Sequence, residues 1–124
     1  MYRILIVEDL AAEVLPLLAA DDLQVNIRRL SRVELLNIIG DYDALIVRWL
    51  TRVDEELLSR AKNLRVVGRA GSSLDNIDLE AATRRGVMVT TTPMINSISS
   101  AEYTLGLLLA VARNIPQACA SVKA

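Results

Sequence analysis

The sequence predicts an α/β domain built on a five-stranded parallel sheet, with helices on both faces and a protruding apolar helix at the C-terminal end. Five short runs rich in Ile, Val and Leu are continuous, which is typical of strands buried on both faces of a parallel sheet. Helical patterns separate these runs, and strict alternation favours right-handed crossovers in an open sheet. Five strands on this scale indicate the flavodoxin-like order 2-1-3-4-5.

The expected strands are short and evenly spaced along the chain. In chain order they are Ile4–Val7, Gln24–Ile27, Ala44–Val47, Leu64–Val67 and Val87–Val89. The helix between the second and third strands should begin after Ser31, because Ser31 and Glu34 have the spacing of a capping box. Gly40 is expected to end it.

Two further helices have acidic caps. Asp54 precedes the helix between the third and fourth strands, and Asp78 precedes the helix between the fourth and fifth. Acidic side chains at a helix start satisfy free N–H groups and oppose the helix dipole. Gly86 can end the second of these helices in a left-handed conformation.

The last expected helix runs from Ala101 to about Arg113, opened by a capping box of Ser99 and Glu102. Apolar residues cover it nearly all round, and such a helix expects burial on every side. We therefore expect a second copy of the chain or an absent domain to cover it. The sequence thus predicts a sheet domain over residues 1–98 and a connecting helix over 99–124.

Composition excludes several classes of function. The net charge is −1 and aromatic residues make up 3% of the 124 residues, so neither nucleic acid nor an anionic membrane is an expected partner. Cys119 is the single cysteine and there is no histidine, which excludes a disulfide scaffold, a Cys/His metal site and a Ser–His or Cys–His dyad. No segment has the length of a bilayer span or the pattern of a signal peptide. The expected location is the cytoplasm.

The start of the chain admits a second interpretation, a phosphoacceptor receiver domain of the same topology. Glu8 and Asp9 after the first strand would supply its acidic cluster. The third strand, however, is followed by Arg48 where such a domain needs an aspartate, and arginine can neither accept a phosphoryl group nor complete a Mg²⁺ site. We reject this interpretation.

Polar side chains collect where the third, fourth and fifth strands end. They are Arg48, Arg69, Ser72, Ser73 and Asn96. Ligands of open α/β sheets bind beyond the carboxyl ends of the strands, and guanidinium groups suit carboxylate and phosphate. Each residue taken singly also fits a turn or surface role, as we expect for Arg52. Taken together they predict a site for a small anionic ligand, with no catalytic residue and no metal.

Four segments follow one another as in a known family: "RWLTRVD", "GRAGSSLDNID", "TTP" and "NSISSAEYTLGLLLAVARNIPQA". In order and spacing the chain resembles the D-isomer-specific 2-hydroxyacid dehydrogenases, and is most similar to the members that oxidise 3-phosphoglycerate with NAD on the way to serine. The resemblance implies the N-terminal part of a substrate-binding domain, followed by the helix that leads into an NAD-binding domain.

The resemblance also implies roles for the five polar residues. Arg48 and Arg69 match arginines near the substrate phosphate. Ser72 and Ser73 occupy the loop whose amides face the substrate carboxylate, the position of Ser72 also touches the cofactor in relatives, and Asn96 lines the same cleft. Ser73 stands where the family usually has a second glycine, which puts substrate affinity in question.

Other family elements are missing from the 124 residues. The family's catalytic histidine, its supporting carboxylate and an orienting arginine would all follow the last residue, and no G-x-G-x-x-G segment occurs. We therefore expect this chain alone to be inactive, to lack NAD and to self-associate through the helix over residues 101–113. The alternatives are a stand-alone or designed binding module, and a fragment of a dehydrogenase acting on glyoxylate or lactate.

Overall fold

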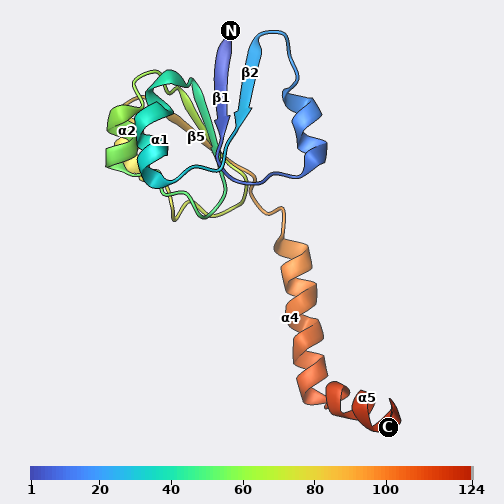
Figure 1. Cartoon of the computed structure of the whole chain (residues 1–124). Coiled ribbons are helices and arrows are strands. Elements are labelled where there is room, and N and C mark those ends of the chain that lie inside the picture. The colour runs from blue at the N-terminus through green and yellow to red at the C-terminus, as the bar shows by residue number, and fades with distance from the viewer. Residues whose placement is uncertain (124) are drawn as a thin grey trace. The chain divides into compact units, whose positions relative to one another are not determined.

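A computed structural model describes residues 1–123 (Figure 1). They fall into two compact units, residues 1–93 and a second unit that begins at Met94. The sheet belongs to the first unit and the C-terminal helices belong to the second. We describe each unit by itself, and the predicted roles of residues 1–98 and 99–124 stay a prediction.

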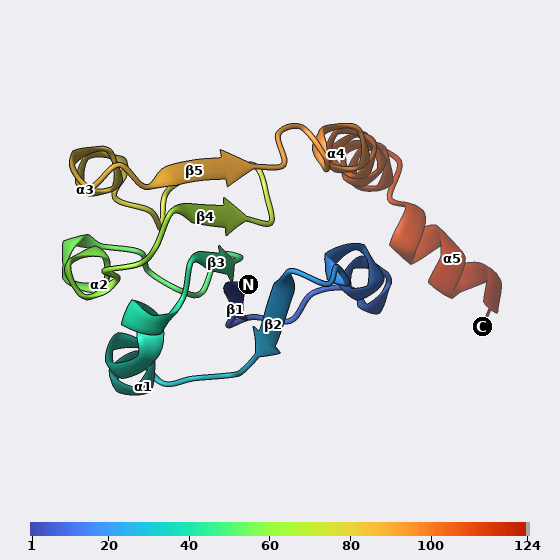
Figure 2. The ribbon, with the colours of Figure 1, turned by 90° about the horizontal axis from the view of Figure 1, so that it is seen from above.

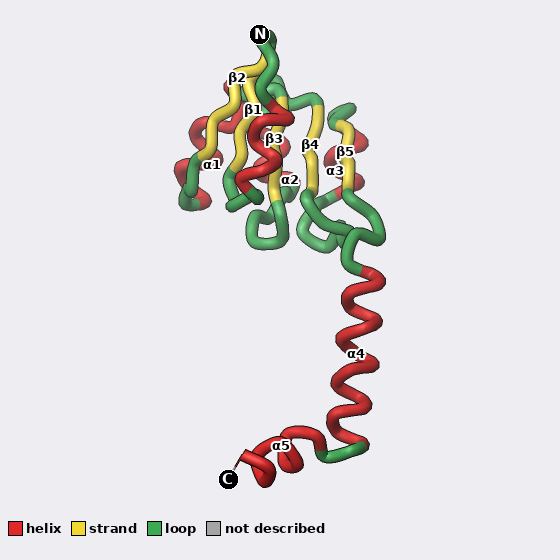
Figure 3. Tube along the Cα trace, turned by 90° about the vertical axis from the view of Figure 1, so that its right-hand side faces the viewer, coloured by secondary structure: helices red, strands yellow, loops and turns green. Residues whose placement is uncertain are grey.

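The first unit alternates strands and helices as expected. Its elements are β1 Tyr2–Ile6, η1 Ala12–Leu18, β2 Leu23–Ile27, α1 Arg32–Ile38, η2 Ile39–Asp41, β3 Ala44–Val47, α2 Glu55–Arg60, β4 Val66–Arg69, α3 Leu79–Arg84 and β5 Met88–Thr91. All strand pairs are parallel and the order is β2-β1-β3-β4-β5, which confirms the predicted fold (Figure 3). β4 starts two residues later than expected. Leu64 is buried, but it lies in the turn before the strand and is not paired with a residue of a neighbouring strand.

The crossover rule accounts for which helix covers which face. The connection from β1 to β2 moves one way along the sheet, whereas the next three connections all move the other way. Right-handed crossovers therefore put η1 on one face and α1, α2 and α3 on the opposite face. Figure 2 shows this arrangement, with the three α-helices together on one side of the strands and the blue helix η1 on the other.

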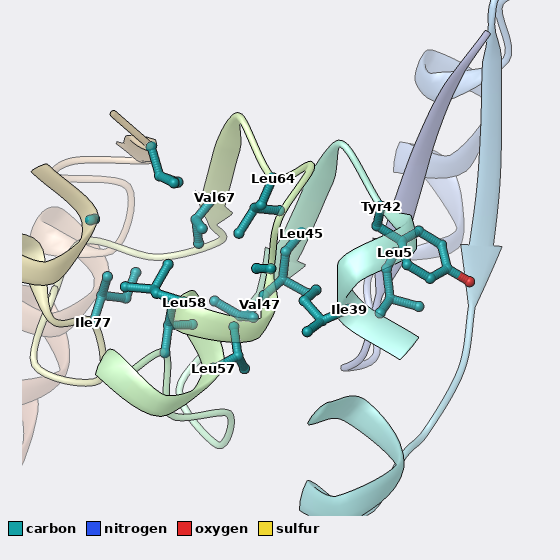
Figure 4. Packing of buried hydrophobic residues seen from close by; sticks show 14 of the residues in the cluster. Leu5, Ile39, Tyr42, Leu45, Val47, Leu57, Leu58, Leu64, Val67 and Ile77 are labelled. Atoms are coloured by element: carbon teal, nitrogen blue, oxygen red, sulfur yellow. The ribbon is translucent and has the colours of Figure 1, made fainter. Parts of the chain in front are cut away.

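The main core lies between the sheet and α1–α3 (Figure 4). Leu5, Leu45 and Val67 enter it from the strands, and Ile39 and Leu57 enter it from the helical side, each with no exposed surface. On the other face, Ile4 and Ile6 of β1 are also buried. The edge strands differ from the expectation of burial on both faces, since Ile27 and Met88 are 53% and 65% exposed.

The caps at the starts of α1, α2 and α3 form as predicted, but the prediction that Gly40 ends α1 is wrong, because α1 ends at Ile38 and Gly40 lies inside η2. Ser31 and Glu34 make a reciprocal capping box, the Asp54 carboxylate accepts from the Leu57 N–H, and the Asp78 carboxylate accepts from the Ala81 N–H at 2.9 Å. Gly86 ends α3 with a φ of +67°. Local sequence signals were sufficient here because a cap is made by residues within three positions of each other.

The second unit holds α4 (Ser97–Ala112) and α5 (Ile115–Lys123). The predicted start at Ala101 is wrong: α4 begins four residues earlier, so Ser99 lies inside the helix and cannot act as its cap. Asn114, with a φ of +50°, turns the chain into α5, which the sequence analysis missed. Pro116 does not prevent α5, because proline is well suited to a first turn.

Helix α4 exposes its apolar side chains. None of its residues is buried, and Tyr103 is 71% exposed and Leu108 64% exposed. Over residues 1–123, no single helix is both long and apolar enough to cross a membrane. Only α4 and α5 taken together, with a bend of 64° between them, meet those requirements of length and composition.

Candidate functional site

The two arginines predicted to bind an anion lie at the ends of neighbouring strands. Arg69 is the last residue of β4 and pairs in register with Val47, the residue directly before Arg48. The Ala70 N–H donates to the Val47 carbonyl oxygen at 2.8 Å, so the pairing continues past the end of β4. The structure therefore brings the backbone of Arg48 and Arg69 to adjacent positions at the carboxyl edge of the sheet. Figure 3 shows β3 and β4 side by side.

Arg69 is held in a space that a glycine provides. A Cβ atom at Gly71 would overlap Nη1 of Arg69 and lie 2.7 Å from its Cζ, and Gly71 has a φ of +153° that favours glycine. The Nε–H of Arg69 is buried and has no hydrogen-bond partner among residues 1–123. The guanidinium thus packs over the loop backbone and keeps one unsatisfied donor.

The two serines of the loop behave differently. The Ser73 hydroxyl accepts from the Asp75 N–H at 3.1 Å, which is an ordinary local turn bond. Within the described part of the chain, positive φ among non-glycine residues occurs only at Met94 and Asn114. Ser73 therefore fits this backbone without a left-handed conformation. Ser72 is exposed.

The carboxylate of Glu8 organises the loop after β3. It accepts from the N–H groups of Arg48 at 2.9 Å, Leu50 at 3.1 Å and Thr51 at 3.0 Å, and Glu8 is only 8% exposed. Burial by itself raises the pKa of this carboxyl, but the bonds from the three N–H groups together outweigh burial and hold the pKa below its ordinary value. Glu8 is therefore an internal anion bound by backbone amides.

Asn76 fastens the loop after β3 to the loop after β4. Its side-chain amide donates to the carbonyl oxygens of Arg48 at 2.9 Å and Thr51 at 2.7 Å. An isolated parallel bridge joins Val53 to Ile77, with the Val53 N–H donating to the Asn76 carbonyl oxygen at 2.8 Å. The two loops that carry the arginines are thus tied together beyond the sheet.

Sequence reasoning missed the roles of Glu8 and Asn76. Glu8 was noticed as an acid after the first strand, but its partners lie at least 40 residues away. Asn76 bonds to carbonyl groups 25 and 28 residues away. Asn commonly bonds to backbone two residues on, and no local pattern distinguishes that role from this one. Only the folded sheet brings these partners together.

The Arg48 side chain is exposed, and its Nη1 donates to the Asp9 carbonyl oxygen at 3.4 Å. Nearby, a cavity of about 540 Å³ lies beyond the ends of β1, β2 and β3, and neither Arg48 nor Arg69 lines it. All three of its arginines are paired with acids, Arg29 with Asp9, and both Arg32 and Arg52 with Asp54. The cavity is therefore distinct from the predicted anion site.

The starts of α1, α2 and α3 are closed to phosphate groups. Each has an acidic side chain in its cap, namely Glu34, Asp54 and Asp78. A dinucleotide fold places its pyrophosphate at such a helix start, which must then be free of acids. The starts of α1, α2 and α3 therefore offer no place for a pyrophosphate. Residues 1–123 contain no group of three or more His, Cys, Asp or Glu side chains arranged for a metal ion.

Asn96 belongs to the second unit, where it is the residue before α4. Its side chain makes no hydrogen bond that caps the helix. The amide is thus not committed to the helix that it precedes, which leaves its predicted role at the anion site as a prediction.

Comparison with known proteins covers nearly the whole chain. The family model described as D-isomer specific 2-hydroxyacid dehydrogenase, catalytic domain, matches residues 4–124. The D-3-phosphoglycerate dehydrogenase of Archaeoglobus fulgidus is 43% identical over 122 residues, which are 98% of this chain and 23% of that protein. The enzyme of the same name from Sus scrofa is 52% identical over 96 residues, which are 77% of this chain and 18% of that protein. The chain spans less than a quarter of the length of these relatives.

Two solved structures share the fold of this chain. The TT0316 protein of Thermus thermophilus superposes with a TM-score of 0.85 at 36% identity, over 98% of this chain and 40% of that one. The NAD+-bound 3-phosphoglycerate dehydrogenase of Entamoeba histolytica superposes with a TM-score of 0.71 at 25% identity, over 88% of this chain and 38% of that one. The polar residues at the sheet edge thus lie in a fold that this chain shares with both solved proteins.

Proposed function

This chain belongs to the D-isomer specific 2-hydroxyacid dehydrogenase family, and from that premise we propose that it is the substrate-binding part of a D-3-phosphoglycerate dehydrogenase-like oxidoreductase. The whole enzyme would oxidise 3-phosphoglycerate to 3-phosphohydroxypyruvate, at the entry to serine biosynthesis. NAD, when bound to such an enzyme, takes up the hydride. This chain would bind and orient the acid, and we assign it no catalytic residue.

The observation that carries the proposal is the pair of arginines at adjacent strand ends. A guanidinium group offers a fixed fork of donors that matches phosphate and carboxylate oxygens. The helix starts of the first unit are occupied by acids, so the anion would have to be bound by side chains and by the loop amides around Ser72 and Ser73. Asn96 would complete the site, and Ser72 would also contact the cofactor in the whole enzyme.

Titration of 3-phosphoglycerate into the 124-residue chain, followed by amide NMR shifts, tests this proposal. We expect the shifts to concentrate on residues 68–76. Arg69→Ala should weaken binding roughly tenfold or more, since a hydrogen bond to a charged group contributes about 1.5–3 kcal/mol. Arg52→Ala is the matched control, because Arg52 is an arginine of the neighbouring loop with a side chain 80% exposed. Equal binding by both variants would remove Arg69 from the site.

The same titration distinguishes the substrate class. D-lactate carries the carboxylate and the hydroxyl but no phosphate group, so it should bind more weakly than 3-phosphoglycerate and lose less affinity in Arg48→Ala. If D-lactate or glyoxylate binds as tightly as the phosphorylated acid, the phosphate assignment of Arg48 and Arg69 is wrong. The family-level proposal would then continue with an unphosphorylated substrate.

We also propose that the isolated chain self-associates through α4, whose apolar side chains are exposed on all sides. In a whole enzyme, part of this surface would face the NAD-binding domain. Light scattering at micromolar concentration measures the outcome directly. A monomer under those conditions would contradict self-association. It would favour the alternative, a stand-alone module that tolerates an exposed apolar helix.

A cytoplasmic location forms part of the proposal. It is supported by the single cysteine, Cys119, which is exposed and unpaired and thus suits a reducing compartment. Cell fractionation of the protein that contains this chain measures it, and recovery in an extracellular or membrane fraction would contradict it.

A further inference from the structure

We infer that Glu8 and Asn76 are positioning residues of the anion site, which hold the loop of residues 48–51 against the loop after β4 and so fix the neighbouring strand ends from which Arg48 and Arg69 extend. The ligand in this inference rests on the proposed function, but the geometry does not. Five hydrogen bonds carry it, three accepted by the Glu8 carboxylate and two donated by the Asn76 amide.

The loop needs such a partner because β3, and with it the regular hydrogen bonding of the sheet, ends at Val47. The N–H groups of Arg48, Leu50 and Thr51 would otherwise be left unpaired where the chain turns away from the sheet, and unpaired buried N–H groups are costly. The three N–H groups converge on one carboxylate, as they would on a bound anion. The Glu8 carboxylate therefore occupies the position at these three N–H groups that an anionic ligand could otherwise take.

This occupation has a consequence for ligand binding. An anionic metabolite cannot use the amides of residues 48, 50 and 51, because Glu8 already accepts their hydrogen bonds. The exposed guanidinium of Arg48 is the one charged group of residues 48–51 and would be the loop's main contact to an anion. Because Glu8 binds these amides, the loop cannot bind an anion through them and instead holds the backbone of Arg48 in place.

Asn76 fixes the opposite side of the same loop. Its two donated bonds reach the carbonyl oxygens at both ends of the turn, those of Arg48 and Thr51. Residue 76 belongs to the loop that follows Arg69, and the Val53–Ile77 bridge continues the attachment. Movement of one arginine-bearing loop therefore requires movement of the other. A site held in this way spends less free energy on ordering its side chains when a ligand binds.

Two nearly isosteric variants test the inference. Glu8→Gln keeps the size of the side chain but replaces one acceptor oxygen by a donor that faces backbone N–H groups. Asn76→Asp removes the donor to both carbonyl oxygens. The matched controls are Asp9→Asn, the neighbouring exposed acid, and Asn63→Asp, whose amide also donates to a backbone carbonyl, that of Gly40 at 2.7 Å.

The first readout is amide hydrogen exchange at residues 48, 50 and 51. We expect exchange at least roughly tenfold faster in Glu8→Gln and Asn76→Asp than in the controls, with β1 and β4 amides unchanged. In the wild type, the shifts of the same three amides should titrate with a carboxyl whose pKa lies below that of an ordinary glutamate. The other charged groups around the cavity that Glu8 lines are Asp9, Arg29, Arg32 and Arg52, and Asp9→Asn should leave this titration in place.

The second readout is binding of 3-phosphoglycerate. We expect roughly tenfold weaker binding in Glu8→Gln and Asn76→Asp, with control variants equal to the wild type. Normal loop exchange together with weak binding, or fast exchange with normal binding, would overturn the inference. If the wild type itself binds no phosphoglycerate, the proposed function fails, and the inference is then decided by exchange alone: equal exchange in Glu8→Gln and Asp9→Asn overturns it. Should Glu8→Gln not fold, Asn76→Asp carries both readouts.

Discussion

The sheet unit and helix α4 are both rich in leucine and other aliphatic residues, yet they use them in opposite ways. Leu45, Leu57 and Val67 have no exposed surface in the sheet unit. In α4, by contrast, Leu107 is 50% exposed and Leu108 is 64% exposed. The strands exist only through pairing with one another, whereas the helix closes its own backbone hydrogen bonds. A run of leucines therefore specifies a helix without specifying what the helix contacts.

Shortening a leucine side chain in each region should give the largest difference in stability between the sheet unit and α4. Leu57→Ala removes a fully buried side chain from the core, and we expect a loss of about 2–5 kcal/mol in the free energy of unfolding. Leu108→Ala in α4 should change it by less than about 0.5 kcal/mol in the monomer. Urea denaturation followed by the NMR signals of the sheet measures both. Equal losses would mean that α4 is packed as tightly as the core.

Glycine replacement should act with opposite sign in the two regions. Gly71→Ala meets both the left-handed φ and the Arg69 guanidinium, so we expect a destabilisation of about 1–3 kcal/mol. Gly106→Ala lies in the exposed interior of α4 with no atom within 4 Å of a new Cβ, and should stabilise that helix by up to about 1 kcal/mol. Urea denaturation reports the first change and circular dichroism the second. A neutral Gly71→Ala would contradict the packing of Arg69 over that glycine.

Removing the residue that precedes a helix should also affect stability differently in the sheet unit and in α4. Asp54→Ala deletes the carboxylate that accepts from the Leu57 N–H, and should cost about 1 kcal/mol of unfolding free energy. Asn96→Ala at the start of α4 should cost less than about 0.5 kcal/mol, because the Asn96 side chain makes no capping bond. Thermal unfolding of both variants against the wild type tests the contrast, which fails if the two changes are equal.

Acid should weaken the sheet unit gradually. The desolvation of Glu8 and Asp54 raises their pKa values, but backbone N–H donors to both, and the Arg32 guanidinium beside Asp54, lower the pKa values below the ordinary ones. The folded state then binds fewer protons than the unfolded state between the folded and unfolded pKa values. Stability is complete above the unfolded pKa, about 4 for these groups, and is lost as pH falls through the folded pKa. Urea midpoints measured from pH 7 to pH 3 should fall, less steeply in Glu8→Gln, and a flat profile would contradict these pKa directions.

The sequence was sufficient for the sheet, its order and the caps at the starts of α1, α2 and α3. These features depend on short-range patterns and on handedness rules that hold for any chain. The start of α4 was misplaced because Ser99 and Glu102 have capping-box spacing inside a helix, where the same residues are simply exposed. α5 was missed because Pro116 follows α4 closely and proline is also common just after a helix ends, whereas here it stands in the first turn of a new helix.

At the candidate site, the sequence located the arginines but not what holds them. Strand ends fixed the positions of Arg48 and Arg69, since register follows from the buried runs. The bonds made by Glu8 and Asn76 span 25 to 43 residues and depend on three loops meeting at one edge. The space at Gly71 that Arg69 fills is likewise a property of two backbone positions in three dimensions, with no counterpart in a linear pattern.

The chain contains a single tryptophan, Trp49, which follows Arg48 directly and is 64% exposed. All indole emission from this molecule therefore originates at one point on the turn after β3. Its emission therefore reports on the environment of the residue next to Arg48, and loosening of that turn should change the fluorescence without any added dye.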